Sequence, residues 1–187
     1  MVWRLVHSRL FWVVGALLAA VLVYLAVGVF GVQTLFYDTE VNEDFAPTLL
    51  ASEAQGPSQA ARSAPRDPIL VSSGSFHPVA HPGSGDAIVY RLEDGSQVLR
   101  LENLDIFNGP ALYVYAVAAK DASDSETVLD AGFLSLGPLK GNKGNQTYEL
   151  AAKFDPNKHR SISIWCQRFS VNFATAPLRQ STVPDGS

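Results

Sequence analysis

The segment from Ser161 to Phe173 constrains the fold most, because its apolar side chains follow the two-residue period of a β-strand. Ile162, Ile164 and Cys166 alternate with serines and a tryptophan, a pattern typical of a strand with one face in a core. After Cys166 the apolar side chains occupy odd positions instead. A slip of one residue exchanges the two faces of a strand, so we expect a bulge or a turn near residues 167–168.

The same period recurs through residues 69–178. Apolar runs are separated by turn signals such as Asp94-Gly95 and Asp155-Pro156-Asn157. The run from Leu112 to Ala118 is apolar on both faces, which predicts a central strand. We therefore expect an all-β domain of about eight strands, a β-sandwich with a barrel as the alternative. Residues 179–187 are predicted to form a disordered tail.

A second feature is the uncharged run from Leu10 to Val32. It exceeds the roughly 20 apolar residues that a transmembrane helix needs. Arginines precede it and carboxylates follow it, which predicts a cytoplasmic N-terminus over residues 1–9 and an extracytoplasmic remainder. We expect a single-pass anchor in the cell membrane over residues 10–32. A cleaved signal peptide is the alternative, although its apolar core is usually only about 7–15 residues long.

Residues 33–68 are predicted to form an extracytoplasmic linker. Four prolines occur between Phe45 and Pro68, among alanine, serine, glutamine and glutamate. Such a composition disfavours regular secondary structure. The domain would therefore work at some distance from the membrane.

Charge and composition exclude several classes of function. The formal net charge of -4 gives no sign of nucleic-acid binding. The single cysteine excludes an intramolecular disulfide and any cysteine-rich zinc or iron–sulfur site. Hydrolase and dinucleotide-binding motifs are also missing from the sequence. We expect an electron-transfer or binding module rather than a turnover enzyme.

The candidate site residues are a cysteine, an arginine and two histidines. Cys166 is either a buried hydrophobic residue, a redox-active thiol whose thiolate Arg168 would stabilise, or a sulfur ligand to iron or copper. His77 and His81 lie four residues apart in a segment that prolines keep from being helical. They are candidate cofactor ligands, or two exposed histidines in a turn. Haem and copper both stay open as cofactors.

Seven segments resemble, in order and spacing, the DM-thirteen domain, an extracellular module proposed to take part in electron transfer. The segments are Gly74-Ser-Phe76, His81 with Ser84-Gly85, Val98-Leu-Arg-Leu101, Gly109-Pro-Ala-Leu-Tyr-Val-Tyr115, Leu136-Gly-Pro-Leu-Lys-Gly141, Gly144-Asn-Gln-Thr-Tyr148 and Ile164-Trp-Cys-Gln-Arg-Phe169. The resemblance covers Gly74 to Leu178. It implies a β-rich extracytoplasmic domain with a characteristic cysteine, which Cys166 matches.

The resulting hypothesis is a membrane-anchored extracytoplasmic domain with a redox role centred on Cys166. Such modules can accompany a multi-helix haem domain, which this chain lacks, so a separate redox partner protein is implied. The alternative is a structural or ligand-binding sandwich with an inert buried cysteine. An accessible thiol near Arg168, His77 or His81 would favour the first, and a thiol enclosed by apolar side chains would favour the second.

Overall fold

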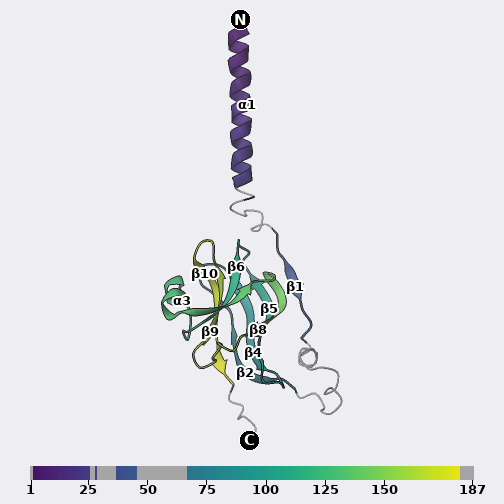
Figure 1. The fold of residues 1–187 in the computed structure, drawn as a ribbon, viewed down its shortest axis with the longest axis vertical. Coiled ribbons are helices and arrows are strands. Elements are labelled where there is room, and N and C mark those ends of the chain that lie inside the picture. The colour runs from purple at the N-terminus through teal and green to yellow at the C-terminus, as the bar shows by residue number, and fades with distance from the viewer. Residues whose placement is uncertain (1, 26–27, 29–36, 46–66, 182–187) are drawn as a thin grey trace. The chain divides into compact units, whose positions relative to one another are not determined.

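The computed structural model describes residues 2–25, 28, 37–45 and 67–181. The chain divides into two compact units, residues 1–37 and 38–187. The described part of the first unit is mainly helix α1, Val2–Tyr24 (Figure 1). This helix begins before the uncharged run, because the arginines that precede the run are good helix formers and are part of the helix.

Helix α1 differs in its bounds from the transmembrane helix expected over residues 10–32. Among the described residues, no helix has both the length and the apolar character required to cross a membrane. Residues 29–36, which include the end of the expected helix, lie outside the described part of the chain.

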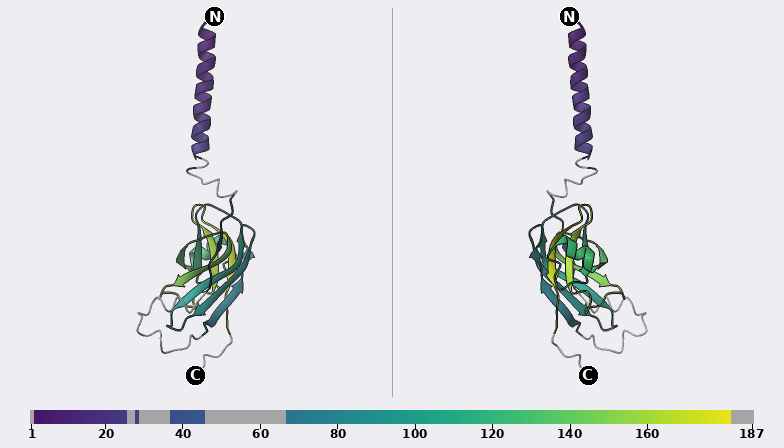
Figure 2. Two further views of the ribbon diagram at one scale, coloured as in Figure 1. Left: turned by 90° about the vertical axis from the view of Figure 1, so that its right-hand side faces the viewer. Right: turned by 90° about the vertical axis from the view of Figure 1, so that its left-hand side faces the viewer.

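The second unit is mostly β and forms two sheets, in agreement with the predicted sandwich (Figures 1 and 2). In the described residues the first sheet has the order β1-β8-β5-β4-β2-β11 and the second has the order β3-β10-β9-β6-β7. The elements are β1 Glu40–Asn42, β2 Ile69–Ser75, β3 His77–Pro78, β4 Gly83–Arg91, β5 Gln97–Ile106, β6 Leu112–Val117, α3 Ser125–Ala131, β7 Phe133–Pro138, β8 Lys143–Leu150, β9 Ser161–Cys166, β10 Val171–Pro177 and β11 Arg179–Gln180.

The core lies between the two sheets. Fully buried side chains such as Val89 and Leu101 from the first sheet meet Val114, Ile164 and Cys166 from the second. Each of these residues belongs to the inward-facing set of an alternating strand, as the two-residue period requires. Strand β6 lies between β7 and β9, which confirms the prediction that the run from Leu112 is central.

Every residue of β9 is buried. Its outer face is covered by a second apolar cluster that includes Trp165 and Val128 of α3. The serines of β9 on this face are satisfied by hydrogen bonds: Ser161 donates to the carbonyl of Ala119 at 3.0 Å, and Ser163 donates to Asn172 at 2.7 Å. The strand ends at Cys166, and residues 167–170 form the turn to β10, which confirms the predicted irregularity.

Three segments differ from the sequence-based expectation. The polar composition of residues 120–130 predicts an exposed loop, but the segment contains most of helix α3, because the Asp124 carboxylate caps the helix by accepting a hydrogen bond from Thr127 N at 2.6 Å. Strand β1 lies within the expected linker and pairs with β8. Strand β11 lies within the expected tail and pairs with β2. Most of that linker, residues 46–66, and residues 182–187 lie outside the described part.

Candidate redox site around Cys166

Cys166 lies at the end of β9 and points into the core. Its side chain is 0% exposed. Leu112 of β6 is its cross-strand neighbour on one side and Val171 of β10 on the other. The thiol donates a hydrogen bond to the carbonyl oxygen of Pro110 at 3.1 Å. The sulfur is therefore enclosed by apolar side chains and held by one backbone acceptor.

Residues 108–111 form the loop that carries this acceptor. A Cβ at Gly109 would lie 2.8 Å from two ring carbons of Phe173, so only glycine lets the loop pack against that ring. Ala111 has a φ of +59°, a left-handed conformation that is costly for a residue with a side chain. Its carbonyl accepts a hydrogen bond from Gln167 N at 3.0 Å. The turn after β9 thus helps to hold the loop in a strained conformation.

Arg168 does not share the environment of the thiol. It is exposed in the turn at residues 167–170, whereas the thiol lies within the core. In the described part of the chain, the Arg168 guanidinium makes no hydrogen bond to the Cys166 sulfur. The residue in this turn that connects to the site is Gln167, through its backbone bond to Ala111 and its side chain, which donates to the Tyr115 hydroxyl at 3.0 Å.

The two histidines have separate partners. His77 Nε2 lies 3.1 Å from an Asp121 oxygen, and its Nδ1 lies 3.1 Å from the Pro78 carbonyl. The His81 ring stacks on Phe107 at 5.0 Å between centroids and packs against Phe173 at 4.1 Å. Phe173 therefore lies against both the His81 ring and Gly109 of the loop at residues 108–111.

The described residues contain no cluster of three or more histidine, cysteine, aspartate or glutamate side chains arranged to hold a metal ion. His77 has oxygen atoms beside both ring nitrogens, His81 is stacked between rings, and Cys166 is buried. These three side chains consequently do not fit a shared iron or copper site.

An aromatic cluster on the outer face of the second sheet was missed by sequence reasoning. Tyr115 stacks on Phe133 at 4.1 Å between centroids and lies 6.0 Å from Trp165. Tyr113 is the cross-strand neighbour of Trp165. Leucine or valine alternates with tyrosine from Leu112 to Tyr115, and this period of two residues was the signal that both tyrosines share one face. Trp165 immediately precedes Cys166, so the two side chains project to opposite faces of β9.

Residues 75–178 match the family Electron transfer DM13. Comparisons with curated proteins and with solved structures found no match. The matched residues make up more than half of the chain and contain Cys166 and the loop at residues 108–111. They also contain all five described strands of the second sheet and strands β4, β5 and β8 of the first. The chain therefore belongs to the Electron transfer DM13 family.

Proposed function

We propose that this protein performs electron transfer with the Cys166 thiol as its redox group. The observation that supports this choice is the loop at residues 108–111. It supplies the hydrogen-bond acceptor of the thiol and contains Ala111 at positive φ. Strained backbone is concentrated at active sites and switch regions. When the loop at residues 108–111 is closed, it protects the thiol. When it opens, a redox partner protein reaches the sulfur.

The chemistry requires one electron and one proton. On oxidation, the thiol of Cys166 gives one electron to a one-electron acceptor on a separate partner protein and releases its proton to water. One electron from a donor and one proton from water then restore the thiol. An oxidised haem or copper centre of the partner is the class of acceptor in this proposal. Because the sulfur is 0% exposed, the exchange of its proton with water needs residues 108–111 to move.

The proposal also places the protein at the cell membrane, with residues 1–9 in the cytoplasm and the β domain outside. The uncharged run from Leu10 to Val32 supports this, as do the exposed apolar side chains of α1 from Phe11 to Tyr24. Protease added to intact cells should remove the β domain. Recovery of a soluble chain that begins near Val32 would instead show a cleaved signal peptide.

A structural or ligand-binding sandwich with an inert cysteine is the second candidate. The complete burial of Cys166 in the main apolar cluster favours it. Free cysteine is among the most buried residue types and often acts as a small hydrophobic side chain. The two candidates differ in whether the folded protein exchanges electrons through this sulfur.

Voltammetry of the purified full-length chain separates the two candidates. We expect a wave that Cys166→Ser abolishes while far-ultraviolet circular dichroism stays unchanged. A wave that persists in Cys166→Ser would place the redox group elsewhere in the chain. No wave in either protein, together with no metal by elemental analysis, would establish the inert sandwich.

The role of the loop can be tested by the rate at which iodoacetamide labels Cys166. Gly109→Ala should clash with the Phe173 ring and open the loop, so labelling should become faster by about tenfold or more if the clash costs ~1.4 kcal/mol. Gly95→Ala is the control for a strained glycine substitution away from the thiol, since Gly95 lies in the β4–β5 turn at a φ of +83° with open space around it. If Gly109→Ala and the unmodified chain have equal labelling rates and equal free energies of unfolding, the loop does not control access to the thiol.

A further inference from the structure

The segment Asp38–Phe45, here called the strap, lies along the edge of the first sheet. Its strand β1 pairs with β8 in parallel, with Glu40 opposite Lys143 and Asn42 opposite Asn145. Backbone bonds continue the pairing at both ends: Lys143 N donates to Thr39 O at 3.2 Å, and Glu43 N donates to Asn145 O at 2.9 Å. The strap therefore occupies the edge of β8 as an added strand.

Two glycines shape this edge for a close backbone approach. A Cβ at Gly141 would lie 2.5 Å from the carbonyl oxygen of Thr39. A Cβ at Gly144 would collide with the carbonyl oxygen of Val41. Both glycines belong to segments by which the sequence resembles its family. Their position suggests that this edge of β8 is shaped to receive a strand.

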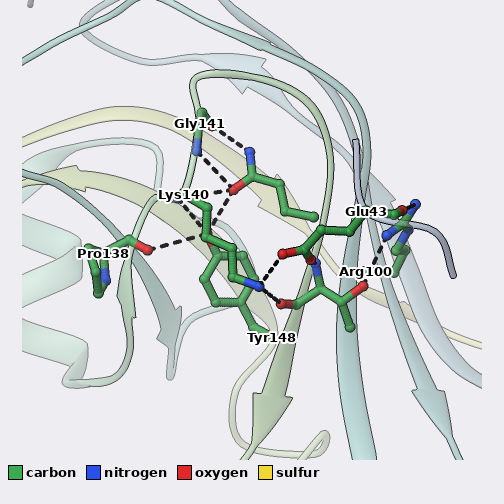
Figure 3. Close-up of polar contacts among 8 residues, drawn as sticks. Glu43, Arg100, Pro138, Lys140, Gly141 and Tyr148 are labelled. Atoms are coloured by element: carbon green, nitrogen blue, oxygen red, sulfur yellow. Dashed lines mark hydrogen bonds and ion pairs between the residues drawn. The ribbon is translucent and has the colours of Figure 1, made fainter. Parts of the chain in front are cut away.

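Cations on the sheet face carboxylates on the strap. Lys140 Nζ lies 2.6 Å from a Glu43 oxygen, and Lys143 Nζ lies 2.8 Å from an Asp38 oxygen (Figure 3 shows Lys140 and Glu43). Thr147 N donates to the other Glu43 oxygen at 2.7 Å. Hydrogen bonds from Lys143 and then Asn142 lower the pKa of Asp38. Burial acts to raise the pKa of Glu43, but hydrogen bonds from Lys140 and Thr147 outweigh it and lower the pKa.

The acceptor side is preorganised by buried groups. The Lys140 ammonium lies 5.1 Å from the Tyr148 ring centroid, and Lys140 N donates to the Tyr148 hydroxyl at 3.1 Å. The side chain of Gln146 is 0% exposed and holds the loop through contacts with Lys140 and Gly141. Arg100 is 5% exposed and donates to the carbonyl oxygen of Glu43 at 2.7 Å. Tyr148 and Gln146 therefore hold the loop that carries Lys140, and Arg100 supplies a buried donor to the strap.

Apolar contacts contribute less to the strap. The side chains of Glu40 and Asn42 are exposed and that of Val41 is half-buried. Phe45 stacks on Tyr90 at 5.0 Å between centroids and lies below the Arg100 guanidinium. Main-chain pairing supplemented by side-chain complementarity is the mode by which sheet edges bind extended peptides. The strap thus shows how an acidic strand binds at this edge.

We propose that the edge of β8, with Arg100, Lys140 and Lys143, is an acceptor site for an acidic strand, and that the strap of a second copy of this chain fills it. The second copy is the partner with the required spacing of carboxylates. Residues 46–66 are 21 residues that join the strap to the next strands, and 21 residues span at most ~70 Å when extended. That length permits a strap to reach a neighbouring domain, so that two copies exchange straps.

Charge reversal tests the exchange in the full-length chain. Variant X carries Asp38→Lys and Glu43→Lys, and variant Y carries Lys140→Glu and Lys143→Glu. Neither can dock its own strap without like charges facing each other. Each strap fits the acceptor of the other variant, however. Affinity-tagged X should therefore retain untagged Y at least tenfold more than it retains untagged X, and the retention of Y should fall as salt is added.

Two controls make the outcome decisive. A chain with all four substitutions restores opposite charges within one molecule, so its urea midpoint should lie above those of X and Y. It should stay below that of the unmodified chain, because Thr147 N and the Asn142 amide lose their carboxylate acceptors on the strap. Retention of Y no greater than that of untagged X would overturn the proposal, because association through any other surface is the same in both pairs. A fourfold midpoint no higher than those of X and Y would also overturn it, since charge would then not select the strand.

Discussion

The thiol region and the strap lie in the same β unit but are held by different forces. The Cys166 thiol is enclosed by apolar side chains that come from both sheets. The strap is held mainly by backbone hydrogen bonds and by carboxylates paired with lysines. The stability that comes from burial of apolar surface changes little with pH or salt, whereas the stability that comes from exposed ion pairs depends on both. The domain therefore has a robust core and an edge strand whose attachment depends on conditions.

The largest effect is expected from a truncation beside the thiol. Ile164 lies on the same face of β9 as Cys166 and is 0% exposed. Ile164→Ala should lower the free energy of unfolding by about 2–5 kcal/mol, since it removes buried methyl groups and leaves a cavity. Urea unfolding measures this. Ile69→Ala is the matched control, because Ile69 is 48% exposed and its loss should be clearly smaller. Equal losses would show that β9 is not the centre of the core.

Removing the buried guanidinium of Arg100, which donates a hydrogen bond to the strap, should have the next largest effect. Arg100 donates to Glu43 O and to Thr147 Oγ1, the latter at 3.0 Å. Arg100→Met keeps the aliphatic stem but leaves both acceptors without this donor, which should cost about 1–3 kcal/mol of unfolding free energy. Arg100→Lys keeps the charge without the planar fork. Full recovery with lysine would mean that charge, rather than the hydrogen-bond geometry, holds the strap.

Acid should weaken the strap before it weakens the core. The pKa values of Asp38 and Glu43 are lowered from 3.8 and 4.5. Their contribution to stability is therefore fully present above these values and is lost as pH falls through the lower pKa values of the folded state. Below about pH 4.5, the free energy of unfolding, measured with urea at each pH, should fall more steeply in the unmodified chain than in the double variant Asp38→Asn/Glu43→Gln. Parallel pH profiles would show that these carboxylates do not stabilise the folded state.

The smallest effect is expected from salt. Raising sodium chloride from 0.1 to 1 M shortens the screening length from about 10 to about 3 Å. Hydrogen exchange at the backbone amides of Glu43 and Lys143, which pair β1 with β8, should become faster by a small factor of about two to three. Amides of β9 should not accelerate. Acceleration of both strands to the same extent would mean that the strap and the core open as one unit.

The sequence predicted the core because its signals are local. The alternation through Ile162, Ile164 and Cys166 and the change of parity after it specify a strand, its inward face and the turn that follows. Family resemblance added the expectation that Cys166 matters. Burial of the thiol was one of the alternatives that residue type left open. Its hydrogen bond to Pro110, 56 residues earlier in the chain, had no local signal.

The strap depended on tertiary structure, for a physical reason. Strand β1 has three residues, too few to show a period, and prolines lie in the segment that follows it. Glu43 meets its partners Lys140 and Thr147 from a sequence separation of 97 and 104 residues. Short-range patterns determined by themselves the main strands between residues 69 and 178 and the faces that these strands bury, but not β1 or β11. Only the folded sheet could decide that an acidic segment pairs with the edge of β8, because the positions of the lysines exist only after the sheet has formed.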